Sequence, residues 1–240
     1  MDFFNKKYFI FDLDGTLIDS IGVWNNADKK LILNHSNKNI KENIIMKDRH
    51  KFLENNQNSD IYVAYCKYLI EKYNFDVKDE YKISKERKEL ANIVLAKETD
   101  FKPGVVELIK LLKDLGFIVI LATTTTKEQL NIYCNVNEKM IKQMKIKDTF
   151  DSIFTKDDVE HKKPDPEIYF KVLEKYNARP NECIVFEDSL HGVMASKAAG
   201  IDTINIYDKY SDSDREKINK IANFKINSYY EVIDYLKKEK

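Results

Sequence analysis

Two aspartates stand two residues apart directly after an apolar run near the start of the chain, in Tyr8-Phe-Ile-Phe-Asp12-Leu-Asp14-Gly-Thr16. Residues two apart on a strand point to the same side, and the glycine that follows lets the backbone turn sharply. Paired carboxylates repel each other and favour a divalent cation, and oxygen-only ligands indicate Mg²⁺. Taken alone, Asp-x-Asp-Gly is also a common turn or the start of a calcium loop, although a calcium loop expects a helix before it.

Three later segments carry polar side chains of complementary type. Thr123 ends a second apolar run, where its hydroxyl could bind a phosphate oxygen or cap a helix. Lys163 stands directly before a proline, whose restriction of the backbone could hold the ammonium group inward, although most such lysines are solvated. Glu187 and Asp188 end a further apolar run, where they could bind a metal or cap the helix that follows.

Together these side chains supply each group that phosphoryl transfer requires. Acids can hold a metal, one carboxylate can attack phosphorus, and hydroxyl donors with a lysine can neutralise the transferring oxygens. Since the groups occur in order along one chain, coincidence of independent turns and caps is a poorer explanation than a single site.

Short apolar runs alternate with helix-period segments over much of the chain, and three of the four polar groups fall where such runs end. This alternation is typical of an α/β fold with a parallel sheet covered on both faces, and ligands bind such folds beyond the carboxyl ends of the strands. The predicted strands are 8–12, 117–122, 152–155, 183–187 and 203–206, and the predicted helices between them include 103–116, 166–176 and 189–200.

The stretch from residue 23 to residue 102 is different, because it contains neither glycine nor proline. Glycine and proline are the strongest helix breakers, so a stretch without them is predicted to be mostly helical. Apolar residues spaced three and four apart, such as Ile61, Ala64 and Tyr65, line one face of a helix. We therefore predict about four packed helices in an inserted domain of residues 19–99, within an α/β core of residues 1–18 and 100–240.

The chain resembles the haloacid dehalogenase superfamily, in its phosphatase and phosphomutase branch, at all four motifs of that family. The residues that carry the resemblance are Asp12 with Asp14, Thr123, Lys163, and Glu187 with Asp188. The resemblance implies a three-layer, Rossmann-like core and identifies the stretch 19–99 as the family's inserted α-helical cap. One departure is Lys162, where the family commonly has glycine before the motif lysine.

The resemblance implies a chemical role for each matched residue. Asp12 would be the nucleophile, and Asp14 would protonate the leaving oxygen and then deprotonate the hydrolytic water. Thr123 would bind the phosphoryl group, and Lys163 would stabilise both the nucleophile and the transferring group. The implied Mg²⁺ ligands are Asp12, the Asp14 carbonyl, Glu187 and Asp188, and the implied substrate-binding residues are Gly15, Thr16 and Thr124. We expect a Mg²⁺-dependent phosphatase that hydrolyses a small phosphorylated metabolite, such as a sugar phosphate, through an aspartyl-phosphate.

Two other functions are open. A β-phosphoglucomutase-like phosphotransferase shares the motifs and the cap, but usually carries a histidine shortly after the first motif, where this chain has Trp24. A catalytically silent interaction protein would be expected to lose at least one chemical residue, and this chain retains them all. The cap candidates for substrate selection are Trp24, Lys47, Arg49 and His50, although packing or surface roles are the stronger interpretation of each.

The composition of the 240-residue chain restricts its partners. It has 40 Lys and Arg against 40 Asp and Glu, and this zero formal net charge gives no global field for nucleic acid. The apolar runs are far too short for a membrane span, and the first residues do not have the order of a secretory signal. The three cysteines lie far apart in the sequence, at Cys66, Cys134 and Cys183. Metal and redox sites require closely spaced cysteines, so these are predicted to be reduced thiols. We therefore expect a cytoplasmic monomer that binds a small phosphorylated molecule, without nucleic acid or membrane.

Overall fold

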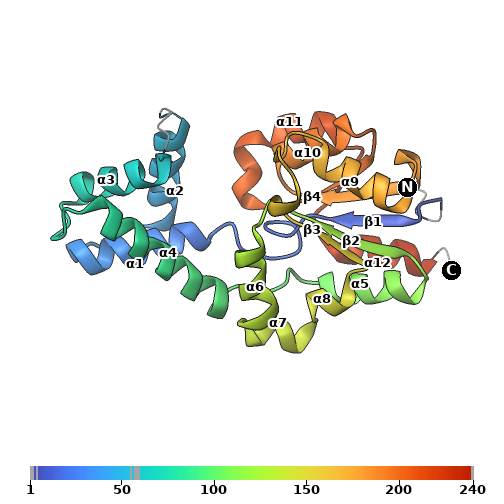
Figure 1. Cartoon of the computed structure of the whole chain (residues 1–240), viewed down its shortest axis with the longest axis horizontal. Helices are drawn as coiled ribbons and strands as arrows, with labels where there is room; N and C mark the ends of the chain where they lie inside the picture. The colour runs from blue at the N-terminus through green and yellow to red at the C-terminus, as the bar shows by residue number, and fades with distance from the viewer. Residues whose placement is uncertain (1–2, 4, 55, 57–59, 239–240) are drawn as a thin grey trace. The chain divides into compact units, whose positions relative to one another are not determined.

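The chain folds into two compact units in the computed structural model, which describes residues 3, 5–54, 56 and 60–238 (Figure 1). The core unit comprises Met1–Ile21 and Asp100–Lys240, and the helical unit comprises Gly22–Thr99. The sequence interpretation placed the two boundaries after residues 18 and 99. Within the described ranges, no helix combines the length and the apolar character that a membrane crossing requires.

A parallel β-sheet forms the centre of the core unit. Over the described residues its six strands lie in the order β3-β2-β1-β4-β5-β6, and every neighbouring pair is parallel. The strands are β1 (Tyr8–Phe11), β2 (Ile118–Ala122), β3 (Ser152–Phe154), β4 (Cys183–Glu187), β5 (Asp202–Ile206) and β6 (Phe224–Ile226). The predicted α/β fold is confirmed, and the structure adds β6, which the sequence analysis had missed.

Helices cover both faces of this sheet, because successive side chains of each strand alternate between the faces. They are α5 (Val105–Asp114), α6 (Lys127–Asn135), α7 (Glu138–Gln143), α8 (Ile146–Thr149), α9 (Glu167–Tyr176), α10 (Leu190–Ala198), α11 (Arg215–Ile221) and α12 (Tyr229–Lys238). Tyr8 and Ile10 of β1 join a buried cluster with α9 and α10. Figure 1 shows α9 and α10 on one side of the sheet and α5 and α12 on the other. Phe11 faces the other way and stacks on Phe186, which in turn contacts Tyr229 of α12. This is the expected three-layer arrangement.

The helical unit consists of four helices in its described part, and Asp60 and Asp79 cap the third and fourth through their side chains. The helices are α1 (Val23–Ser36), α2 (Glu42–Glu54), α3 (Ile61–Tyr73) and α4 (Glu80–Lys97). Their apolar faces enclose a small core, and a buried ion pair lies beside it, in which Arg87 Nε donates to Asp28 Oδ1 at 2.5 Å. The Arg87 guanidinium also stacks over the Trp24 ring, with 4.6 Å to the centroid.

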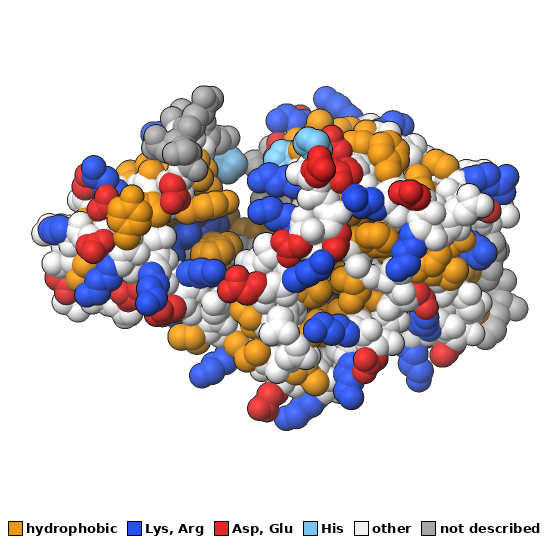
Figure 2. Space-filling model, viewed as in Figure 1, with side chains coloured by type: hydrophobic (Ala, Val, Ile, Leu, Met, Phe, Trp, Pro, Cys, Tyr) orange, Lys and Arg blue, Asp and Glu red, His pale blue; other side chains and the backbone are white. Residues whose placement is uncertain are grey.

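The surface and the thiols agree with the composition. Figure 2 shows basic and acidic side chains interspersed over the viewed face, as the equal numbers of the two charges suggest.

All three cysteines are free, and Cys66 and Cys183 are buried. Burial raises the pKa of the Cys66 thiol to about 11 and that of Cys183 to about 12, so both stay as unreactive thiols near neutral pH.

Candidate active site

The carboxyl ends of β1 and β4 meet at the centre of the sheet. Phe11 lies opposite Phe186 in the parallel pairing, and the Asp12 backbone N–H donates to the Phe186 carbonyl at 3.0 Å. The chain continues from β1 to β2 on one side of this pair and from β4 to β5 on the other. Such a reversal of strand order opens a crevice at the carboxyl edge of a doubly wound sheet. Asp12 therefore stands at this switch point, beside Glu187 and Asp188.

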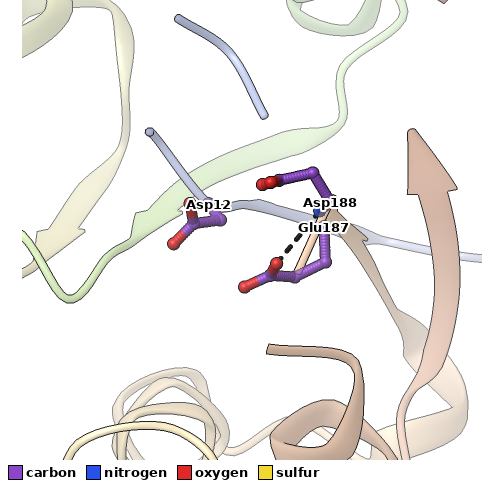
Figure 3. A group of neighbouring side chains, drawn as sticks. All are labelled: Asp12, Glu187 and Asp188. Atoms are coloured by element: carbon purple, nitrogen blue, oxygen red, sulfur yellow. Dashed lines mark hydrogen bonds between the residues drawn. The ribbon is translucent and has the colours of Figure 1, made fainter. Parts of the chain in front are cut away.

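These three acids form a buried carboxylate cluster. Each offers one oxygen, and the three oxygens lie within 4.8 Å of one another. Figure 3 shows the carboxyl groups of Glu187 and Asp188 both reaching toward Asp12. Burial raises the pKa of Asp12 to about 7, and repulsion from Glu187 adds to this effect while Lys163 opposes it. Burial, then repulsion from its two acidic neighbours, raises the pKa of Asp188 well above its usual range.

The donor set fits a hard divalent cation. Three buried carboxylates face one buried ammonium group, that of Lys163, so the ionised cluster carries an excess of negative charge. A cation of charge two among these oxygens would offset that excess, and all-oxygen ligands are those that Mg²⁺ takes in proteins. This supports the predicted Mg²⁺ site on the chemistry of its ligands.

Lys163 joins the cluster from the loop before α9. Its ammonium group donates to Asp12 Oδ1 at 2.7 Å, to Glu187 Oε1 at 2.7 Å and to the Ala122 carbonyl at 2.9 Å. The three protons of the ammonium group are thus all used, which fixes its position. Burial works to lower the pKa of Lys163, but the Asp12 and Glu187 carboxylates outweigh it and raise that pKa well above its usual range. Lys163 is therefore a permanent positive charge beside Asp12.

Glu187 is held on both of its carboxylate oxygens. Oε1 accepts from Lys163, and Oε2 accepts from the backbone N–H groups of Asp188 and Ser189 at 3.0 and 3.1 Å and from the Ser189 hydroxyl at 3.0 Å. The carboxylate lies where a Cβ at Gly192 of α10 would stand. The first turn of α10 therefore fixes Glu187, and Glu187 in turn fixes Lys163.

Asp14 carries a separate set of partners, all of them hydroxyl groups. Its Oδ1 accepts from Ser20 at 2.5 Å and from Tyr133 at 2.7 Å, and its Oδ2 accepts from Thr125. These three donors were not predicted from the sequence. Ser20 lies in the same loop as Asp14, whereas Thr125 in the turn after β2 and Tyr133 of α6 are more than 100 residues away in the sequence.

The remaining predicted residues lie around the cluster in different ways. Gly15 adopts a φ of +83°, and any side chain there would overlap the Asp188 carboxylate. Thr16 is buried and donates to Asp188 Oδ1 at 2.7 Å. Thr123 is buried at the end of β2, and its hydroxyl donates to Thr125 Oγ1 at 3.0 Å. The Thr124 side chain, in contrast, is exposed.

The candidate selectivity residues of the helical unit also have distinct environments. Trp24 is half-buried under the Arg87 guanidinium, and Arg49 approaches Asp28, whose carboxylate is fully buried, at 3.5 Å. Lys47 and His50 are exposed. Trp24 and Arg49 thus belong to the charged and aromatic cluster of the helical unit.

Comparison with known proteins agrees with this geometry. The family model of haloacid dehalogenase-like hydrolases matches residues 6–200. Hexitol phosphatase B of Escherichia coli O157:H7 is 28% identical over 224 residues, which cover 93% of this chain and 92% of that protein. The phosphorylated carbohydrates phosphatase of Thermotoga maritima is 37% identical over 102 residues, or 42% of this chain and 44% of that protein.

A solved structure shares the fold over nearly its whole length. The crystal structure of a putative beta-phosphoglucomutase from Thermotoga maritima aligns with a TM-score of 0.73 at 24% identity, covering 97% of this chain and 99% of that one. The fold resemblance extends through both units, and the family-model match includes all of the matched motif residues. The chain therefore belongs to the haloacid dehalogenase-like hydrolases.

Proposed function

We propose that this chain is a Mg²⁺-dependent phosphatase that hydrolyses a small phosphorylated carbohydrate, or a similar monoester, through an aspartyl-phosphate on Asp12. The observation that carries the proposal is the buried Asp12 carboxylate, which accepts from Lys163 at 2.7 Å beside two further acids. The names of the relatives, a hexitol phosphatase and a phosphorylated carbohydrates phosphatase, support carbohydrate monoesters as the substrate class.

The first chemical step needs an ionised Asp12. Burial disfavours the ionised form, and the Lys163 ammonium group favours it, so the ion pair keeps the nucleophile available near neutral pH. A carboxylate oxygen of Asp12 attacks phosphorus in line while the bond to the leaving oxygen breaks. Asp12, the Asp14 carbonyl, Asp188 and the predicted ligand Glu187 would hold Mg²⁺, which would supply Lewis-acid neutralisation of the phosphoryl oxygens.

Asp14 transfers protons in both steps of this proposal. It gives a proton to the leaving alcohol oxygen, and the resulting carboxylate then takes a proton from the water that attacks the aspartyl-phosphate. That water releases inorganic phosphate and restores Asp12. Thr123 is proposed to donate to the phosphoryl group, with Gly15, Thr16 and Thr124 as the further predicted contacts.

We assign the helical unit, as the cap, the selection of the substrate, and its candidate residues are Trp24, Lys47, Arg49 and His50. A cytoplasmic location is part of the same proposal and is supported by three free cysteines. A monomeric state is also proposed, and size-exclusion chromatography with light scattering tests it.

The direct test is phosphate release from a panel of sugar phosphates, nucleotides and other small monoesters, with and without Mg²⁺. We expect Mg²⁺-dependent release that Asp12→Asn lowers by roughly 10³-fold or more. Asp19→Asn, the same chemical change at an exposed residue of the same loop, should leave the rate unchanged. Isomerisation of β-glucose 1-phosphate is followed in parallel. Isomerisation without net phosphate release would show that the protein is a phosphotransferase and not a phosphatase. Full activity of Asp12→Asn would overturn the assignment of Asp12 as the nucleophile.

A further inference from the structure

Tyr133 of α6 is a buried tyrosine whose hydroxyl reaches the candidate acid and base. Its side chain is 2% exposed, and the hydroxyl donates to Asp14 Oδ1 at 2.7 Å. Helix α6 begins at the turn after β2, where the Thr126 side chain accepts from the Gln129 backbone N–H and caps the first turn. The same turn carries Thr125, the donor to the other oxygen of Asp14. The start of α6 thus sets both contacts at once.

The hydroxyl donors use most of the acceptor positions of Asp14. An ionised carboxylate has about four such positions, two on each oxygen. Ser20 and Tyr133 use both positions of Oδ1, and Thr125 uses one on Oδ2. Counting the donors among the residues that the structure describes, a single position is therefore left, on Oδ2. Burial, then the negative charge of Asp14, raises the pKa of Tyr133 well above its usual range, so its hydroxyl stays protonated and able to donate.

We propose that Tyr133 is a positioning residue for the acid and base: it fixes Oδ1 of Asp14, so that Oδ2 carries the proton that passes to the leaving oxygen. This inference rests on the proposed phosphatase. As the oxygen of Asp12 bonds to phosphorus, the electron pair of the breaking P–O bond goes to the leaving oxygen, which takes the proton from Oδ2. In the second step the attacking water returns a proton to Oδ2 as its oxygen bonds to phosphorus, and the electron pair of the breaking P–O bond goes back to the Asp12 carboxylate.

Proton transfer from Asp14 assists the departure of some leaving groups and not of others. This difference distinguishes a residue that orients Asp14 from one that only supports the fold. The alcohol of a sugar phosphate is a poor leaving group as an alkoxide, so its departure needs a well-placed acid. The phenolate of p-nitrophenyl phosphate is stable and departs without a proton. A residue that only supports the fold would affect both substrates alike, whereas a residue that orients Asp14 affects the alkyl ester.

The experiment compares Tyr133→Phe with the unaltered protein in Mg²⁺, on the best alkyl monoester of the panel and on p-nitrophenyl phosphate. We expect kcat/KM for the alkyl ester to fall by about tenfold or more, while kcat/KM for the aryl ester stays within about twofold. Ser20→Ala removes the other donor to Oδ1 and should give the same split. Tyr176→Phe is the matched control, because it removes a tyrosine hydroxyl that lies 2.6 Å from Ser152 Oγ, at the amino end of β3.

Each other outcome counts against the inference. Equal losses on the two esters in both Tyr133→Phe and Ser20→Ala would make these side chains structural supports. An unchanged or increased kcat/KM for the alkyl ester would show that the contact does not orient the acid for transfer. If the unaltered protein released no phosphate from either ester in Mg²⁺, the proposed phosphatase would be overturned, and this inference with it.

Discussion

Gly192 shows how a missing side chain can determine the position of a charged one. The Glu187 carboxylate occupies the space beside this glycine and is held there by Lys163 and by the first turn of α10. Any larger residue at position 192 must move the carboxylate, and four hydrogen bonds to Glu187 resist that movement. The position of Lys163 beside Asp12 therefore depends on the absence of a side chain at position 192.

We predict that Gly192→Ala lowers kcat/KM for the best substrate by about 10²-fold, because displacement of Glu187 also displaces Lys163. The helix itself should tolerate the change, since alanine is the better helix former. Circular dichroism and steady-state kinetics measure the two effects separately. Lys197→Ala, at an exposed position of the same helix, is the control and should keep full activity. Unchanged kinetics in Gly192→Ala would show that Lys163 does not need Glu187 for its placement.

The sequence predicted the charged residues of the cluster, Lys163 included, and missed the three hydroxyl donors to Asp14. Asp12, Glu187 and Asp188 could be found because the carboxyl ends of parallel strands share one edge of the sheet. Tyr133 lies on a helix, far from Asp14 in the sequence, and no local pattern distinguishes a tyrosine that points to the site from one that packs in the core. Among the consecutive threonines after β2, the backbone turn determines that Thr125 is buried while Thr124 is exposed, and no periodicity encodes that turn.

At the scale of elements, a histidine joins two parts of the helical unit. His35 near the end of α1 lies 2.6 Å from Asp76 through Nδ1 and 2.8 Å from Glu86 of α4 through Nε2, and its ring stacks on Phe75. Both ring nitrogens can donate only when the imidazole is protonated. Burial works to lower the pKa of His35, but the hydrogen bonds to Glu86 and Asp76 outweigh it and raise that pKa above 6.5.

This contact should make the helical unit less stable at high pH. The pKa of His35 is higher in the folded than in the unfolded chain. The stabilisation that its contacts give is therefore complete below pH 6.5 and is lost as the pH rises through the pKa of His35 in the folded chain. Trp24, the only tryptophan, lies in this unit, so its fluorescence in urea reports the unfolding midpoint. We expect His35→Gln to lower the midpoint at pH 6 and to differ less from the unaltered protein at pH 9. His191→Gln, at an exposed position of the core unit, should reproduce the unaltered profile.

Helices and strands could be predicted from the sequence where their patterns of apolar residues are long. Helix α5 has apolar residues at helical spacing before Gly116, and β4 is a continuous apolar run, so both were expected from the sequence. Strand β6 has three residues, one of them Lys225 between two apolar neighbours, and so short an alternation is not distinguishable from a loop. Pairing with β5 makes it a strand, and that contact is tertiary.

At the scale of the whole molecule, the carboxylate cluster places repulsion inside the core unit. Three acids are buried at the central strands, and Lys163 offsets only part of their charge. The site therefore lowers the free energy of unfolding, and with it the stability of the protein, when no cation is bound, as do other sites in which like charges are held together. The whole chain has 40 basic and 40 acidic residues, and this zero formal net charge supplies no long-range field that would offset the repulsion within the cluster.

Mg²⁺ should consequently raise the thermal stability of the protein. A ligand that binds only the folded state at a hundredfold excess over its Kd adds about 2.7 kcal/mol, which for a chain of this size corresponds to a rise in Tm of roughly 5–10 °C. Scanning calorimetry with Mg²⁺ and then with excess EDTA measures the rise and its reversal. Asp188→Asn should raise the Tm of the metal-free protein, because it removes one of the repelling charges, and should abolish most of the response to Mg²⁺. Asp234→Asn, at an exposed residue of α12, should change neither quantity, and an undiminished Mg²⁺ response in Asp188→Asn would place the cation outside this cluster.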